Sequence, residues 1–310
     1  MRKIRGRSIR VGSMDDAPRL DTLHIDVEDV PVDAYRTALY TADELYDAPA
    51  YADSLDARTY AWSMRPPTPA DSLAQALHDH AIDQALTGWL AGRHLIGVMG
   101  GHDLLRGEPA YADAARLGAL LGASRTVATG GGPGAMEAAN LGGRLAHAGA
   151  DALDEALGRL AAAPTFLPSV DAWLSTALPV TALGDSPTLG IPTWFYGQEP
   201  SNVFATAIAK YFRNATREAI LLQVCDAGIV FLPGAAGTVQ EIFQDACENY
   251  YAAESSVAPM VLVGRHYWTS DYPAWPLLQA LARGRAMESH VHLVDTVEEA
   301  AAMVAAGPWL

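Results

Sequence analysis

The chain has 310 residues, of which 50% are hydrophobic and 18% are charged, and this globular composition excludes disordered and collagen-like proteins. Its formal net charge of −15 argues against DNA or RNA as a partner, because proteins that bind a phosphate backbone present a basic surface. The two cysteines cannot form a disulfide framework. There is no apolar run of about 18 residues and no apolar segment after the basic residues 1–11, so we expect a cytoplasmic protein without a membrane span or signal peptide.

Residues 1–90 are predicted to form a mainly helical N-terminal extension. Its first 70 residues or so are polar and acidic, with helical spacing of apolar residues over 34–46. The proline-rich stretch 65–69 separates this part from a second predicted helix over 72–90, which Asp71 is placed to cap.

Short apolar runs and helical stretches alternate along residues 91–310. The runs lie at 94–99, 125–129, 190–196, 227–232, 260–264 and 290–294, and the helical stretches at 110–121, 135–147, 203–223, 239–250, 274–283 and 297–305. This alternation is typical of βαβ units around a parallel sheet. We therefore predict one doubly wound α/β domain over 91–310, with a helical insertion at about 148–187 that is clearest over 151–162.

Two glycine-rich turns follow the first two predicted strands, where open parallel sheets bind ligands. The first turn, Gly100-Gly101-His102, is either a plain turn or a close approach of backbone to ligand. The second turn joins a strand to a helix and contains Gly130, Gly131, Gly132 and Gly134. Its amides and the helix dipole predict an anion site. Glu137 in the first helical turn would repel a phosphate, unless its carboxylate faces another part of the ligand such as a sugar.

A third glycine-rich turn, Pro233-Gly234-Ala235-Ala236-Gly237-Thr238-Val239-Gln240-Glu241, also joins a strand to a helix. Gly234, Gly237 and Thr238 fit a second anion site. Thr238 and Glu241 also have the spacing of a capping box, which would explain them without a ligand, but not the glycines. Two such turns facing one crevice suggest a phosphorylated ligand held between them.

The second and third turns together resemble the LONELY GUY (LOG) family of nucleotide phosphoribohydrolases, whose members are often mislabelled lysine decarboxylases. Gly100-Gly101-His102, the segment 132–137 and Glu199-Pro200-Ser201-Asn202 are most similar to the larger bacterial nucleotide 5′-monophosphate nucleosidases. The resemblance covers about residues 92–305, leaving out the first 90 residues and the insertion. It implies a Rossmann-like fold in a homo-oligomer, at least a dimer.

The resemblance also implies hydrolysis of the N-glycosidic bond of a nucleoside 5′-monophosphate to free base and ribose 5-phosphate, without metal or cofactor. The family's catalytic arginine and glutamate match Arg217 and Glu241, with Arg213 as a second candidate for the arginine. Glu137 would bind ribose hydroxyls or share the catalysis, and Asn202 would join the three turns in binding the nucleotide. Ala235 departs from the pattern, since the family usually has glycine there.

Three other functions compete with hydrolysis. A lysine decarboxylase would depend on Lys210, which is predicted inside a helix away from the glycine turns. A dinucleotide oxidoreductase would need its glycine fingerprint after the first strand and an acidic residue ending the next one, and neither is present. A nucleotide sensor or carrier without turnover remains open. The nine histidines show no metal-ligand cluster.

Overall fold

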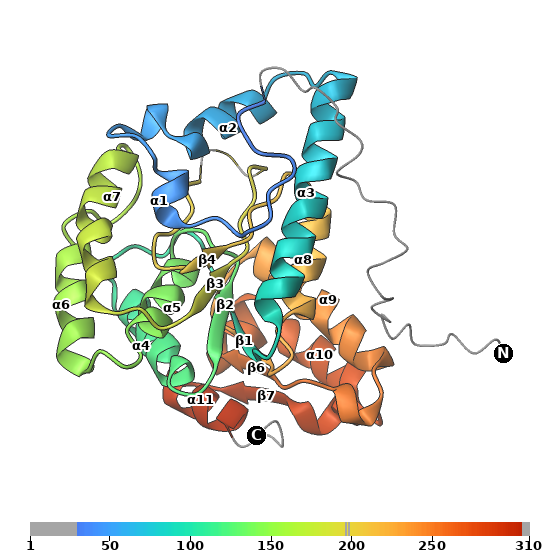
Figure 1. The fold of residues 1–310 in the computed structure, drawn as a ribbon. Coiled ribbons are helices and arrows are strands. Elements are labelled where there is room, and N and C mark those ends of the chain that lie inside the picture. Colours follow the sequence, from blue (N-terminus) through green and yellow to red (C-terminus); the bar gives the residue numbers. More distant parts are fainter. Residues whose placement is uncertain (1–29, 196, 198, 306–310) are drawn as a thin grey trace.

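The computed structural model describes residues 30–195, 197 and 199–305, and contains a parallel sheet with helices on both sides (Figure 1). Residues 1–29 of the predicted extension lie outside the described residues. Within the described part the sheet has seven strands in the order β4-β3-β2-β1-β5-β6-β7. The strands are β1 Leu95–Met99, β2 Thr126–Thr129, β3 Thr188–Gly190, β4 Ala207–Ile208, β5 Ile229–Phe231, β6 Met260–Val263 and β7 Val291–Val294.

All neighbouring strands run parallel, as the register of β1 on its two neighbours illustrates. Gly97 lies opposite Ala128 of β2 on one side and Ile229 of β5 on the other. The chain builds the sheet outward from β1 to β4, returns, and builds the other half from β5 to β7. The doubly wound α/β prediction is therefore confirmed, and the topological switch point lies between β1 and β5, where such sheets bind ligands.

Side chains of β1 alternate between two cores. Ile96 and Val98 belong to the first core, which contains α4 Pro109–Gly122, α5 Ala135–Arg144 and α11 Val297–Ala305. Leu95 and Met99 belong to the second core, against α3 Pro69–Leu90, α8 Asn214–Gln223, α9 Ala236–Tyr251 and α10 Ala274–Ala282. A strand buried on both faces needs apolar side chains at every position, which explains the unbroken apolar runs in the sequence.

The N-terminal segment adds α1 Ala42–Leu45 and α2 Leu55–Ser63 ahead of α3. The helix predicted over 34–46 is wrong except for α1. The helix predicted over 72–90 is confirmed, but it begins at Pro69 and Thr68 is its N-cap. Asp71 completes a capping box by accepting from the Thr68 backbone at 2.8 Å, so it lies inside the helix and does not precede it.

Two predictions on the far half of the sheet differ from the structure. The run 190–196 contributes only its first residue to β3, and the helix predicted over 203–223 is in fact β4 followed by α8. β4 has two residues, and it pairs with β3 while the backbone of Ile208 also exchanges hydrogen bonds with Tyr40. Pairing with distant segments therefore overrides the local helical spacing of this stretch.

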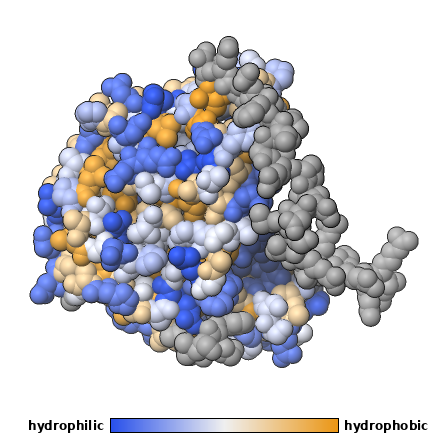
Figure 2. All heavy atoms as spheres, viewed as in Figure 1, coloured by the Kyte–Doolittle hydropathy of each residue, from blue (hydrophilic) through white to orange (hydrophobic). Residues whose placement is uncertain are grey.

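The insertion contains α6 Ala150–Leu160 and α7 Val170–Ala177, so the helix predicted over 151–162 is confirmed. No described helix is long and apolar enough to cross a membrane. On the face shown in Figure 2, hydrophobic residues form small separate patches among hydrophilic ones.

Helices α4 and α5 pack in backbone contact. Gly118 of α4 lies against Ala139 of α5, and a Cβ on Gly118 would overlap the Ala139 carbonyl oxygen. We expect Gly118→Ala to lower the free energy of unfolding by about 1–3 kcal/mol, because helix backbones in contact have no room for a methyl group. Gly158→Ala in α6 is the matched control, since nothing lies within 4 Å of its Cβ position.

The control should leave stability unchanged or raise it by up to about 1 kcal/mol, the difference in helix propensity between alanine and glycine. Urea unfolding of both variants measures the effect. Equal stabilities of the two variants would contradict the close packing of α4 on α5.

Candidate active site

The three predicted glycine turns meet at the carboxyl ends of β1, β2 and β5. The amide of Gly101 donates to the carbonyl of Pro233 at 3.1 Å, and the amide of Ala135 donates to the carbonyl of Gly101 at 3.0 Å. Gly134 has a φ of +71°, and a Cβ there would collide with the backbone of His102. The first turn is therefore held between the second and the third.

The third turn leaves a row of backbone amides without a protein acceptor. Helix α9 starts at Ala236 after the N-cap Ala235, and no side chain caps it. Among the described residues, nothing accepts a hydrogen bond from the amides of Gly234 through Thr238. The capping-box interpretation of Thr238 and Glu241 is therefore wrong, and the amides at this helix start remain available to an anion.

Gly234 also lies directly against Thr238. A Cβ on Gly234 would overlap the Thr238 hydroxyl and approach the amide of Gly101 to 2.9 Å. The turn needs glycine at this position because the Thr238 side chain and the backbone of the first turn both approach it closely. The hydroxyl of Tyr267 donates to the Gly234 carbonyl at 3.1 Å and braces the turn from the far side.

The second turn is held mainly by other parts of the chain. Asn202, which is fully buried, donates from its backbone to Gly131 at 2.9 Å and from its side chain to Gly132 at 3.1 Å. The amide of Gly131 donates in turn to the Thr129 hydroxyl at 3.0 Å. Asn202 thus lies against the second turn, and its hydrogen bonds hold the turn in shape.

Arg217 ties the second turn to α8. Its guanidinium donates to the carbonyl oxygens of Ile191 at 2.6 Å and Gly130 at 3.0 Å, and to Glu218 at 2.9 Å. The side chain is buried. Arg213, by contrast, is the exposed N-cap residue of α8 and its amide donates to Asp79. Of the two candidate arginines, Arg217 is the one that touches a glycine turn.

Glu241 lies one turn into α9, beside this arginine. Burial raises the pKa of its carboxyl from 4.5 to about 8, while the charge of Arg217 acts to lower it and that of Glu218 to raise it. A carboxyl whose pKa is moved by burial and a specific charge partner is typical of functional sites. Glu241 and Arg217 are thus brought together from the two helices that follow β4 and β5.

Glu137 is buried in an ion pair with Arg106, a residue that the sequence analysis missed. Two guanidinium nitrogens donate to the carboxylate, Nε at 3.0 Å and Nη2 to the other oxygen. Arg106 also donates to the Trp173 carbonyl at 3.0 Å and to the Thr176 hydroxyl at 2.9 Å. The pair explains how a carboxylate lies beside the second turn, because Arg106 neutralises its charge.

Glu199, to which the sequence analysis gave no role of its own, is a further carboxyl at the crevice. It pairs with His102 Nδ1 at 3.2 Å, and its carboxylate comes within 3.9 Å of a Cβ built on Gly132. Burial raises the pKa of Glu199, while the charges of His102, Arg217 and Lys210 lower it. Glu199 belongs to the segment 199–202 that the sequence analysis singled out. No nearby sequence pattern indicates its contact with His102, which lies about 100 residues earlier in the chain.

Lys210 lies outside any helix, contrary to the sequence prediction, in the segment between β4 and α8. Its ammonium is buried, 2.5 Å from Asp56 of α2 and 2.9 Å from the Ser201 hydroxyl. Burial lowers the pKa of Lys210, and Asp56 opposes this shift. Lys210 therefore links the N-terminal segment to the loop that bears Glu199 and Asn202.

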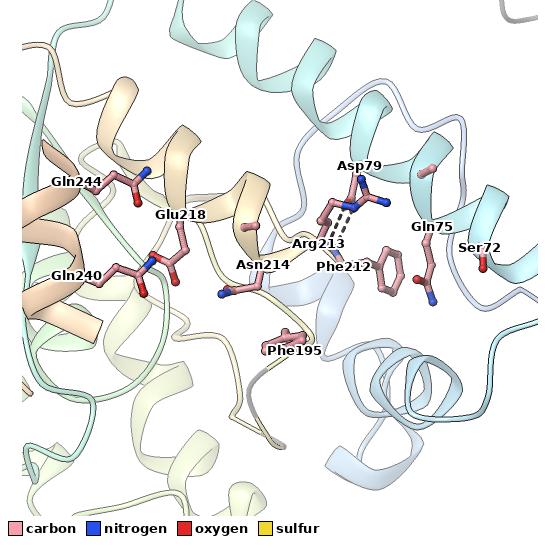
Figure 3. A pocket seen from close by; sticks show the side chains of 12 residues that line it. Ser72, Gln75, Asp79, Phe195, Phe212, Arg213, Asn214, Glu218, Gln240 and Gln244 are labelled. Atoms are coloured by element: carbon pink, nitrogen blue, oxygen red, sulfur yellow. Dashed lines mark hydrogen bonds between the residues drawn. The ribbon is translucent and has the colours of Figure 1, made fainter. Parts of the chain in front are cut away.

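Two pockets flank the converging turns. The amide-lined pocket, of about 690 Å³, lies between α3, α8 and α9; its polar lining includes Gln75, Asn214, Glu218, Gln240 and Gln244 (Figure 3). The insertion pocket, of about 250 Å³, is lined by residues of the first two turns and by 164–167 and Trp173 of the insertion. In the described residues no group of three or more metal-ligand side chains is placed to bind a metal ion.

No family model matches the chain, and no curated protein matches it in sequence. Solved structures similar to it include the molybdenum cofactor binding protein from Rippkaea orientalis, 17% identical over 69% of this chain and 96% of its own, with a TM-score of 0.43. The molybdenum cofactor carrier protein from Chlamydomonas reinhardtii is 19% identical over the same shares, also with a TM-score of 0.43. At these values nothing about the ligand of this chain follows from the similarity.

The raised pKa of Glu241 has a consequence for stability. In the unfolded chain the carboxyl ionises near 4.5, whereas in the folded chain it does so at about 8, so stability falls as the pH rises through this interval. We expect Glu241→Gln to remove this loss and to raise the melting temperature at pH 8 by a few degrees more than at pH 5.

Glu155→Gln is the matched control, since Glu155 is exposed on α6. Thermal unfolding of both variants and of the wild type at the two pH values gives the comparison. A Glu241→Gln protein that melts lower than the wild type at pH 8 would show that the carboxylate supports the fold.

Proposed function

We propose that the protein hydrolyses the N-glycosidic bond of a nucleoside 5′-monophosphate and releases the free base and ribose 5-phosphate. The observation that carries the proposal is the buried carboxyl of Glu241, within the electrostatic influence of Arg217, on a helix whose first amides have no protein acceptor among the described residues. An anion site and a desolvated carboxyl one helical turn apart suit a ligand with a phosphate at one end and a reacting sugar next to it.

The phosphate binds at the third turn. The amides of Gly234 through Thr238 and the Thr238 hydroxyl supply donors, and the dipole of the 16-residue helix α9 adds partial positive charge. Gly237 is exposed, with nothing within 4 Å of its Cβ position, so the approach to these donors is open. Ala235 leaves its amide in the same row, and its methyl group lies on the exposed side of the turn.

The sugar then lies over Glu241. Cleavage breaks the bond between C1′ and the base nitrogen, whose electron pair leaves with the base, and positive charge develops on the sugar ring. The Glu241 carboxylate stabilises this charge and takes one proton from the attacking water. The departing base takes up one proton from solvent, and Glu241 returns its own proton to solvent after the reaction. The water oxygen ends on C1′, so the products are ribose 5-phosphate and the neutral base.

The remaining site residues shape the crevice. Gly100, Gly101 and His102 form its wall on the β1 side, and Gly130, Gly131, Gly132 and Gly134 its floor, held by Asn202. Glu137, held by its pair with Arg106, lines the insertion pocket, and in the proposal it approaches the ligand from the sugar side. Metal and cofactor have no part in the proposal.

Incubation with the 5′-monophosphates and the nucleosides of five bases, read by mass spectrometry, tests the proposal. We expect base release from monophosphates only, increasing as the pH rises towards about 8 because the carboxylate form of Glu241 is required. Glu241→Gln should lose at least about 100-fold in kcat/KM. The Glu155→Gln protein is again the matched control.

Two outcomes would replace the proposal. Tight binding of a monophosphate without turnover, equal in the wild type and in Glu241→Gln, would establish a nucleotide sensor or carrier. If nucleosides are cleaved as readily as monophosphates, the third turn does not bind a substrate phosphate during the reaction.

Arg217 and Arg213 give a second comparison within α8. Arg217→Lys loses the planar fork that joins two carbonyl oxygens and Glu218, so we expect kcat/KM to fall by about 10–100-fold. Arg213→Lys, at the exposed helix start, should fall by less. Steady-state kinetics measures both, and the opposite order would assign the family's arginine to position 213.

A further inference from the structure

The amide-lined pocket opens between three helices of the second core. Its walls are the first half of α3, the first turns of α8 and the second and third turns of α9. Figure 3 shows Gln240 and Gln244 of α9 pointing towards Glu218 and Asn214 of α8, with Phe195 beside them. Gln75 and Ser72 of α3 close the opposite side.

The lining suits a flat, neutral, polar ring. Phe195 is 59% exposed at this pocket, and Phe212 is fixed by stacking on Trp194 at 4.6 Å between ring centres. Within the described residues the side-chain amides of Gln75, Gln240 and Gln244 make no hydrogen bond. An amide offers both a donor and an acceptor, as the edge of a nucleobase does, and phenyl rings stack on base faces.

The two carboxylates of the pocket already have partners, and the third charged residue of its lining, Arg213, is exposed. Glu218 accepts from Arg217, and Asp79 accepts from the amides of Phe212 and Arg213, each at 2.9 Å. Two carboxylates against the one guanidinium of Arg213 make this pocket less suited to a phosphate than the third turn is. The pocket chemistry therefore separates it from the third turn, which favours one.

Helix α9 connects the two regions. Gly237, Glu241 and Gln244 are spaced four and three residues apart and so lie on one face of the helix. From Gly237 to Gln244 the helix rises about 10 Å, comparable with the extended length of a nucleoside 5′-monophosphate. Along this face come first the free amides, then the carboxyl of Glu241, then the side-chain amide of Gln244.

We infer that the amide-lined pocket binds the base of the nucleotide, with Gln244 and Gln240 of α9 and Gln75 of α3 forming hydrogen bonds to its edge. The inference rests on the proposed function and extends it, because it gives the N-terminal segment the task of selecting the base. Phosphate, sugar and base then lie in order along α9, with the bond to be cleaved at Glu241.

Kinetics on the 5′-monophosphates of adenosine, guanosine, inosine, cytidine and uridine tests the inference. Gln75→Ala and Gln244→Ala should each lower kcat/KM for the preferred base by about 3–10-fold, the effect of losing one uncharged hydrogen bond. The differences in kcat/KM between the monophosphates should become smaller. Inhibition by ribose 5-phosphate should stay as in the wild type. Gln279→Ala, on the exposed face of α10, is the matched control and should leave the ratios unchanged.

A variant in the insertion pocket tests the alternative that the base binds there. Leu167 is 64% exposed at that pocket, and Leu167→Ala should preserve the order of the bases. If Leu167→Ala changes the order while Gln75→Ala and Gln244→Ala do not, the base binds in the insertion pocket and the inference is overturned.

Binding of the free bases separates this inference from the proposed function. Adenine, hypoxanthine, cytosine and uracil are titrated into the wild type and the two glutamine variants and followed by ligand-observed NMR. If the wild type hydrolyses no monophosphate, the proposed function fails. Base binding that weakens in Gln75→Ala and Gln244→Ala would still support the pocket assignment, and binding that is equal in all three proteins would overturn it.

Discussion

The guanidinium of Arg217 is the interaction on which the geometry of the site depends. It donates to the carbonyl oxygens of Gly130 and Ile191, which follow the neighbouring strands β2 and β3. Its third nitrogen donates to the carboxylate of Glu218. Burying a charge is costly unless the geometry is good and the donors are used, and here three hydrogen bonds meet both conditions. One buried cation thus fixes two strand ends relative to α8 and stands beside the carboxyl of Glu241.

Two further buried ion pairs attach the parts of the chain that surround this centre. The pair of Arg106 and Glu137 joins the loop after β1 to α5. A hydrogen bond from Arg106 to α7 attaches the insertion to the same loop. Lys210 and Asp56 join α2 to the segment that leads into α8. Breaking such a pair leaves an uncompensated charge, so each one specifies how its segment sits against the strand ends. The N-terminal segment and the insertion are therefore structural parts of the crevice.

The sequence predicts what is local and misses what depends on distant contacts. The three glycine turns could be found because strand, turn and helix follow one another in the chain, and the structure brings all three together. The first half of the helix predicted over 203–223 is wrong because β4 is stabilised by pairing with β3 and Tyr40, whereas its second half is α8. Arg106 lies 31 residues from Glu137, and no local pattern couples the two. The capping-box spacing at Thr238 is real, but α9 starts two residues earlier, so the spacing falls inside the first turn.

The position of Glu241 explains why a carboxyl would be kept where burial disfavours its charge. In the folded chain burial raises its pKa to about 8, and Glu218 offsets part of the attraction from Arg217. A cationic sugar above the carboxyl would stabilise the ionised form, and a neutral ground-state sugar would not. In the proposed hydrolysis the interaction would therefore strengthen as the glycosidic bond breaks, which is the condition for lowering a barrier and not merely tightening binding. Under the proposed function, Glu241 would contribute little to binding the nucleotide and mainly to its cleavage.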